Sequence, residues 1–200
     1  MKDKSYKQIR NEVAELVKQA CFRRKNYFGG GTWECHIVPV VKHSLKLGEK
    51  LKADLKVLEL AALLHDYANL VNAKKYEKEH HVHGAMFAEK ILKEYNYPKE
   101  KIEHIKDCII SHRGSVKVAH KTIESRILAS ADAMSHISEL ADMFFLTFGI
   151  HKFGSRDGSV WLRNKLRRGW KKTMKEGKEI VREEYLMAMK ILNRNIKNIR

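Results

Sequence analysis

The chain contains 200 residues, 44% of them hydrophobic, and its 40 Lys and Arg against 24 Asp and Glu give a net charge of +16. This length suits one domain with a sizeable core, and only two prolines among abundant Leu, Ile, Ala, Lys and Glu favour an all-α fold over a sheet. The three cysteines show no CxxC pair or disulfide-framework spacing, and no run reaches the roughly 18 apolar residues that span a bilayer, which excludes a disulfide scaffold and a membrane-spanning protein.

The first three predicted helices cover residues 5–25, 33–51 and 55–66. Apolar side chains recur in each at the three- and four-residue spacing of an amphipathic helix. Thr32 and Asp54 are the expected N-caps of the second and third helices. The third is apolar along most of its length, which indicates burial, and it leads directly into His65 and Asp66.

The next part of the chain is less regular before it becomes helical again. Residues 70–81 are polar, and His83 with Gly84 opens the following helix, so we expect His83 near a helix start. A turn at Pro98 begins another helix, because proline suits the first helical position. This helix has His112 at its C-terminal end.

Three helical stretches are expected in the remainder of the chain. Thr122 is the predicted N-cap of a long helix from residue 123 to about 148, in which Asp132 falls beside the apolar stripe. A loose joint at three glycines then separates it from helical stretches around 161–174 and 178–199. We expect these last stretches to pack back on the core.

Charge is distributed unevenly along the chain. Residues 151–200 hold 15 Lys and Arg against 5 Asp and Glu, a net charge of +10, and leave +6 for residues 1–150. Basic runs such as 163–168 are typical of a solvated helix face, and they are also suited to binding nucleic acid or another polyanion. The absence of a Pro/Ser-rich linker indicates that both parts belong to one domain.

A row of histidines and aspartates is the most informative pattern. His65 and Asp66 follow core-type residues, and an imidazole next to a carboxylate can hold a divalent cation when further ligands arrive from elsewhere. Candidates are His36 upstream and His83, His112 and Asp132 downstream. Asp132 lies inside an apolar helix, where an unpaired carboxylate costs several kcal/mol, so it needs a partner such as a shared metal.

This constellation resembles the HD superfamily of metal-dependent phosphohydrolases, whose signature is a helical His, an adjacent His-Asp and a distant Asp. The resemblance covers about residues 30–145 and is carried by 33–36, 58–66 and 127–132. It implies an HD-type helical bundle, for which we expect roughly seven to nine helices. We expect residues 1–150 to form the metal-binding domain and 151–200 to form basic C-terminal helices packed on the same domain.

The resemblance also implies a set of ligands. It assigns His36, His65, Asp66 and Asp132 to a first metal, and members with a second metal add two histidines. By position these are His83 and His112, with His80 and His81 as close competitors for His83.

One departure from the HD pattern concerns phosphate binding. Many members carry a lysine shortly after His-Asp, whereas this chain continues Tyr67-Ala68-Asn69. Lys74 or the adjacent Lys75 is a substitute from the following loop, and Arg113 is a candidate for a bidentate phosphate clamp. The alternative for Arg113 is a helix C-terminal cation that offsets the dipole.

The expected chemistry is hydrolysis of a phosphoester or phosphoanhydride of a nucleotide or related phosphorylated metabolite. A bound divalent metal lowers the pKa of its water, and Asp66 takes part as a ligand at the reacting centre. One or two ions are expected. His and carboxylate ligands favour Fe or Mn, then Zn, Co or Ni, over Mg or Ca.

Two other functions are compatible with the sequence. Some similar HD proteins use a di-iron site to activate oxygen, which makes a di-iron oxygenase the alternative enzyme. A non-catalytic module, stabilised by metal and binding nucleic acid through the basic C-terminal segment, is the third interpretation.

The sequence also predicts the location and the partners of the protein. Residues 1–6 lack the apolar core of a signal peptide, so we expect a cytoplasmic protein with a small phosphorylated substrate and no membrane partner. No pattern in the sequence predicts an oligomeric state.

Overall fold

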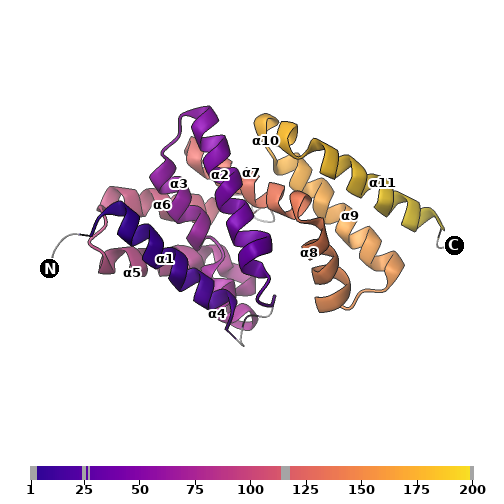
Figure 1. Ribbon diagram of the computed structural model, residues 1–200, viewed down its shortest axis with the longest axis horizontal. Coiled ribbons are helices and arrows are strands. Elements are labelled where there is room, and N and C mark those ends of the chain that lie inside the picture. Colours follow the sequence, from indigo (N-terminus) through magenta and orange to yellow (C-terminus); the bar gives the residue numbers. More distant parts are fainter. Residues whose placement is uncertain (1–3, 24–25, 27, 114–117, 199–200) are drawn as a thin grey trace.

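The computed structural model describes residues 4–23, 26, 28–113 and 118–198, and all regular structure within them is helical (Figure 1). In chain order the elements are α1 (Tyr6–Cys21), the π-helical turn η1 (Trp33–Ile37), α2 (Val38–Leu51), α3 (Leu55–Leu64), α4 (Tyr67–Tyr76), the 3-10 turn η2 (Glu77–Glu79), α5 (His80–Glu94), α6 (Lys99–Ser111), α7 (Ile123–Ser138), α8 (Leu140–Phe144), the π-helical turn η3 (Phe145–Ile150), α9 (Ser155–Lys172), α10 (Lys175–Ile180) and α11 (Arg182–Asn198). The predicted all-α bundle is therefore confirmed. None of the described helices is long and apolar enough to cross a bilayer.

Helix α7 joins the two halves of the molecule. Figure 1 shows α1–α6 grouped on one side of α7 and α8–α11 on the other. Leu128 and Ala131 of α7 belong to an apolar cluster formed with α1–α6, whereas Ile127, Met134 and Ile137 belong to a second cluster formed with α9 and α11. Both faces of α7 are therefore buried, and the C-terminal helices pack on the face opposite the first cluster.

Two of the predicted helix starts are capped as expected. The Asp54 carboxylate accepts hydrogen bonds from the backbone N–H groups of the first turn of α3, and the Thr122 hydroxyl accepts one from Ser125 at the start of α7. Thr32 does not cap the second helix. Its own backbone is already helical, and its hydroxyl donates to the Gly29 carbonyl at 2.7 Å.

Two other boundaries differ from the prediction. The long helix expected up to about 148 ends at Ser138, because Glu139 leaves the helical region at φ −99° and ψ 55°. The polar segment 70–81 is itself largely helical, although Asn72 breaks α4 at φ −163° and ψ 86°. As a result α5 begins at His80, one turn before the predicted start.

Gly84 permits a close approach near the most informative residues. A Cβ atom at this position would lie 3.0 Å from the His65 carbonyl oxygen and 3.3 Å from Cγ2 of Ile109. The missing side chain lets α5 pack directly against the junction of α3 and α4. This contact holds the backbone of His65 in place from the side of α5.

Candidate active site

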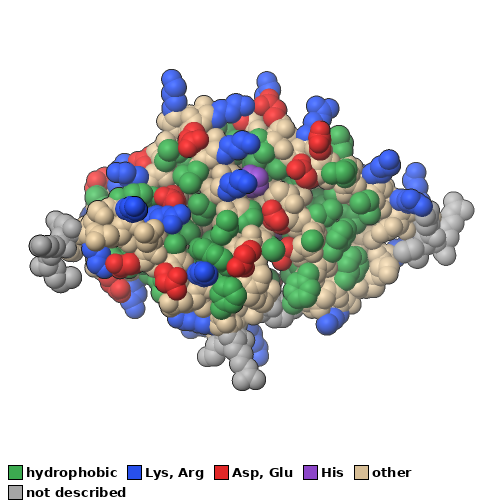
Figure 2. Space-filling view, viewed as in Figure 1, with side chains coloured by type: hydrophobic (Ala, Val, Ile, Leu, Met, Phe, Trp, Pro, Cys, Tyr) green, Lys and Arg blue, Asp and Glu red, His purple; other side chains and the backbone are tan. Residues whose placement is uncertain are grey.

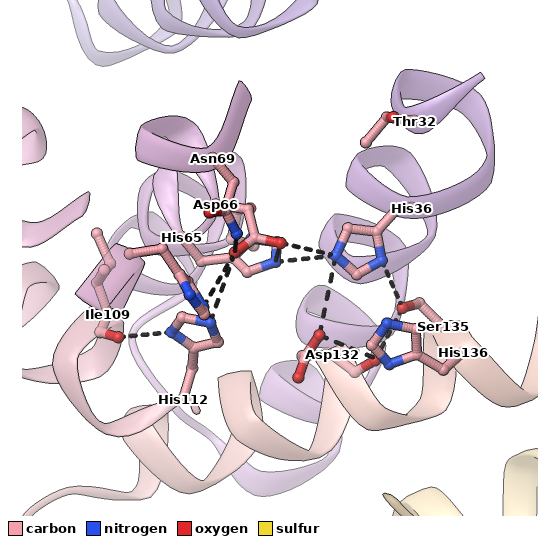
Figure 3. A network of polar contacts seen from close by, with 12 residues as sticks. Thr32, His36, His65, Asp66, Asn69, Ile109, His112, Asp132, Ser135 and His136 are labelled. Carbon is pink, nitrogen blue, oxygen red and sulfur yellow. Dashed lines mark hydrogen bonds and ion pairs between the residues drawn. The ribbon is translucent and has the colours of Figure 1, made fainter. Parts of the chain in front are cut away.

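Five of the predicted ligands converge on one space inside the bundle, as Figure 3 shows. His36 comes from the π-helical turn η1, His65 and Asp66 connect α3 to α4, His112 caps the C-terminus of α6, and Asp132 lies in the middle of α7. His65 is fully buried and Asp132 is 9% exposed. The sequence places these residues far apart, and the bundle brings their side chains together.

The ligand atoms form two overlapping groups. His36, His65 and Asp132 offer one set, and His65, Asp66 and His112 offer the other, with the atoms of each set lying within 4.8 Å of one another. His36 Nε2 lies 3.1 Å from His65 Nε2 and 3.4 Å from Oδ2 of Asp66. Asp66 uses its other oxygen, Oδ1, toward His112 at 3.8 Å, so this one carboxylate faces both groups.

Backbone carbonyls fix the orientation of two imidazoles through their Nδ1 atoms. The Nδ1–H of His65 donates to the Ala62 carbonyl at 2.8 Å, and that of His112 donates to the Ile109 carbonyl at 2.6 Å. A carbonyl oxygen can only accept, so both protons sit on Nδ1. Each Nε2 consequently presents a lone pair to the cluster, as a metal-binding histidine requires.

His36 is oriented through a hydroxyl. Ser135 donates its Oγ–H to the Asp132 carbonyl at 2.8 Å and accepts from His36 Nδ1 at 3.0 Å. The Nε2 atoms of His36 and His65 therefore face each other as acceptors, and the arrangement needs a cation between them. Although burial lowers the pKa of His36, the neighbouring Asp66 and Asp132 carboxylates outweigh it, so the pKa is raised.

The charge states of the other groups suit a metal as well. Burial raises the pKa of Asp66, but His65 and His36 outweigh this effect and hold the pKa well below its ordinary value. Burial, with the neighbouring His65, lowers the pKa of His112 to about 3. Ionised carboxylates beside neutral imidazoles are the protonation states in which these side chains bind divalent ions. The donor set thus fits a divalent metal.

We expect Ser135→Ala to weaken metal binding about 10- to 100-fold, the usual effect of removing the group that orients a ligating histidine. His36 would then be free to rotate and to move its proton to Nε2. Titration of the metal-free protein with Mn²⁺ measures the loss. Ser138→Ala, one turn along α7 and hydrogen bonded to His43 instead, is the matched control. Equal affinity of Ser135→Ala and the unmodified protein would contradict this role.

His83 does not join the cluster. Its ring packs against Tyr76, with the centroids 4.7 Å apart, whereas His80 Nε2 lies 3.5 Å from Asp66 Oδ1. The Nδ1–H of His80 donates to the Glu77 carbonyl at 2.9 Å, as in the other imidazoles. Because α5 starts three residues before the predicted position, His83 lies about 4.5 Å further along the helix axis. His80, the competitor noted in the sequence, takes the place assigned to His83.

The two predicted phosphate contacts have different positions. Lys74 is exposed and does not occur among the described residues that line the cavity beside the cluster. Arg113 does line this cavity, and its guanidinium donates to the Lys78 carbonyl.

Three residues at the site were not predicted from the sequence. The Lys172 ammonium lies 2.7 Å from Oδ2 of Asp132, and His136 Nδ1 lies 3.9 Å from Oδ1 of the same carboxylate. Lys165 lines the cavity from α9. The four-residue spacing from Asp132 to His136 is visible in the sequence and places both on one face of α7. The two lysines lie on another helix, and their basic runs gave no sign of this site.

A cavity of about 370 Å³ opens beside the cluster. Outside the cluster its charged lining consists of Glu77, Arg113, Asp142, Lys165, Arg168 and Lys172. Another part of the wall is apolar and comes mainly from η3 and α9, with Phe145, Leu146, Ile150 and Trp161. The cavity therefore joins the candidate metal site to both cationic and apolar surface.

An all-α bundle that brings together a helical His, a His-Asp pair and a distant Asp is the arrangement of a helical protein with a candidate metal site of histidine and aspartate ligands. The HD domain family matches residues 33–137, more than half of the chain, and the protein belongs to this family. The matched range contains every residue of the two ligand groups. No curated protein sequence matches the chain.

Solved structures resemble the whole chain, including α9–α11. The Lin1889 protein of Listeria innocua has 20% identity and a TM-score of 0.70, covering 96% of this chain and 95% of that one. YpgQ of Bacillus subtilis, solved in complex with ADP, has 19% identity and a TM-score of 0.68 over 97% and 96%. A predicted HD superfamily hydrolase from an uncultured Thermotogales bacterium has 19% identity and a TM-score of 0.63, covering 94% of this chain and 91% of that one. At these identities the likeness shows the fold.

Proposed function

We propose that the protein is a metal-dependent phosphohydrolase that acts on a phosphoester or phosphoanhydride of a nucleotide or related phosphorylated metabolite. The observation that carries this proposal is the position of the His/Asp cluster, which opens directly onto a cavity with Lys and Arg in its wall. Cationic side chains beside a metal site attract and orient phosphoryl oxygens. The ADP bound to YpgQ, which shares the fold, makes nucleotides the first compounds to test.

The residues divide into those that would hold metal and those that would hold substrate. His36, His65 and Asp132 would hold one ion, and Asp66 and His112, joined by His80, would hold a second. A divalent ion bound there supplies a water of lowered pKa and neutralises charge on phosphoryl oxygens. Fe or Mn suits this donor set best, followed by Zn, Co and Ni.

The protein groups around the cluster have separate roles in this proposal. Lys172 donates to one oxygen of Asp132 and to the His112 carbonyl at 3.0 Å, so it fixes the carboxylate while leaving Oδ1 toward the cluster. Burial raises the pKa of Asp132, but the Lys172 ammonium and the nearby imidazoles keep it well below its ordinary value. Arg113 presents a planar guanidinium suited to a phosphate.

A di-iron oxygenase is the second candidate, because the six His and Asp donors suit iron equally well. A nucleic-acid-binding module is less favoured. Lys and Arg side chains are spread over the face seen in Figure 2, with Asp and Glu between them. Trp170 of the basic segment is stacked on Tyr185, with ring centroids 4.1 Å apart, which is packing within the protein.

Metal content and substrate turnover together test the proposal. We expect protein purified without chelator to contain Fe or Mn, and to release phosphate or pyrophosphate from nucleotides under anaerobic conditions. A panel of nucleoside mono-, di- and triphosphates, assayed beside an oxygen electrode, gives the measurement. Oxygen consumption without release of phosphate or pyrophosphate would support the oxygenase instead. Protein that takes up no metal after reloading would remove both enzyme candidates.

A further inference from the structure

One face of α9 lines the cavity, and its residues follow helical spacing. Trp161, Lys165, Gly169 and Lys172 are separated by four, four and three positions, which places them on the same side of the helix. The exposed Arg167 and Lys171 lie on other faces and do not occur among the described residues of this lining. The basic runs of the C-terminal segment therefore combine a solvent face with a face that belongs to the site.

The two lysines of this face differ in their contacts. The Lys172 ammonium is held between the Asp132 carboxylate and the His112 carbonyl. The Lys165 ammonium makes no hydrogen bond or ion pair with any residue that the structure describes. Its nearest aromatic contact is the Trp161 ring, with Nζ 5.9 Å from the centroid.

The surroundings of Lys165 favour an anion from outside the protein. Burial lowers the pKa of Lys165, and Asp132 acts in the opposite direction without touching it. A partly buried ammonium without a hydrogen-bonded anion is costly, and a bound phosphate would remove this cost. Among the charged residues of the lining, Glu77 and Asp142 repel phosphate, whereas Lys165, Arg168 and Lys172 of α9 attract it.

The apolar wall next to Lys165 suits a planar ring. Phe145 is 53% exposed although it lines a cavity, and Leu146, Ile150 and Trp161 surround the same part. Trp161 packs edge-on against His151, with ring centroids 5.1 Å apart, so its orientation is set by its neighbours. Rigid aromatic surface of this kind binds flat apolar groups well.

We infer that Lys165 anchors the phosphate chain of the substrate while the wall formed by Phe145, Leu146, Ile150 and Trp161 receives its planar ring. This inference rests on the proposed function and deepens it, because it selects nucleoside di- or triphosphates over small phosphorylated sugars. Lys165 lines the same cavity as the ring wall and the ligand residues His36, Asp66 and Asp132.

The test uses two probes that resist hydrolysis. Methylenediphosphonate offers the phosphate chain alone, and α,β-methylene-ADP offers the chain together with the ring. Calorimetric titration of metal-loaded Lys165→Met should show about tenfold or greater weakening for both probes, the loss expected for a charge-assisted hydrogen bond. Trp161→Leu should weaken the binding of α,β-methylene-ADP at least about fivefold and leave the affinity for methylenediphosphonate unchanged. Lys171→Met, on the exposed side of α9, is the matched control and should bind both probes like the unmodified protein.

The outcomes separate this inference from the proposed function. Equal affinity of Lys165→Met and the unmodified protein for both probes would overturn the anchor, even if the unmodified protein hydrolyses nucleotides. Equal weakening by Lys165→Met and Lys171→Met would also overturn it, because net charge would then be the cause. Failure of the proposed function is recognised independently, as absence of phosphate or pyrophosphate release from every nucleotide in the panel. Metal content and circular dichroism of each variant confirm that ligands and fold are intact.

Discussion

Asp66→Asn is expected to abolish turnover and to weaken binding of divalent metal by more than about a hundredfold. Loss of a ligand should exceed the loss of about 10- to 100-fold that follows removal of a group that only orients a ligand. Asp66 belongs to one ligand group and also faces the other. Its Oδ2 lies 3.4 Å from His36 and 3.6 Å from His65, while its Oδ1 faces His80 at 3.5 Å. Asparagine keeps the shape but removes the charge, so one candidate metal position loses a ligand and the other loses a neighbouring negative charge.

Elemental mass spectrometry of the purified variant, beside a phosphate-release assay, measures the two effects. Asp142→Asn is the matched control, since Asp142 lines the same cavity but belongs to neither ligand group. It should retain the metal content of the unmodified protein. Helical content should be unchanged in both variants, because Asp66 lies at the junction of α3 and α4 and makes no side-chain cap. A full metal complement in Asp66→Asn would show that this carboxylate is not a ligand.

The predicted cluster could be read from the sequence because its members carry local signs of their surroundings. His65 and Asp66 follow an apolar helix that is buried along most of its length, and Asp132 interrupts the apolar stripe of another. A polar group in such a position needs a partner, whichever way the helices pack. This physical requirement does not depend on the topology, and it holds for these residues in the structure.

The exchange of His83 for His80 shows where local signals fail. Three histidines occur within four residues, and the correct one depends on where α5 begins. The structure starts the helix at His80 without a capping side chain, so the sequence contained no Ser, Thr, Asp or Asn to mark the boundary. A shift of one turn moved the choice from one histidine to another.

The lysines of α9 could not be assigned for a different reason. Lys172 is 40 residues from Asp132 in the chain, and its contact exists only because α9 packs against α7. Composition indicated an excess of positive charge in this segment without indicating which side chains face inward. The i, i+4 face that contains Trp161 and Lys165 becomes meaningful only when the partner helix is known.

Removal of metal is expected to lower the midpoint of thermal unfolding by about 5–10 °C. A ligand present at a hundred times its dissociation constant stabilises the folded state by about 2.7 kcal/mol, and each kcal/mol corresponds to about 2–4 °C in a chain of this size. The physical reason is that ligands from η1, the α3–α4 junction, α6 and α7 meet at one point. A bound ion connects these elements, whereas the unfolded chain offers no such site.

Differential scanning fluorimetry of chelator-treated protein, before and after addition of Mn²⁺, gives this shift. Asp66→Asn should unfold at the same temperature with and without Mn²⁺, which separates binding at the cluster from weak binding to surface carboxylates. Asp66 and Asp132 are held in their ionised form by the nearby imidazoles and, for Asp132, by Lys172. A divalent ion adds a stronger positive charge beside them, so Mn²⁺ should raise the unfolding midpoint of the unmodified protein more than that of any variant that lacks one of these carboxylates. If Mn²⁺ raised the unfolding midpoint of Asp66→Asn as much as that of the unmodified protein, the stabilising ion would bind elsewhere on the molecule.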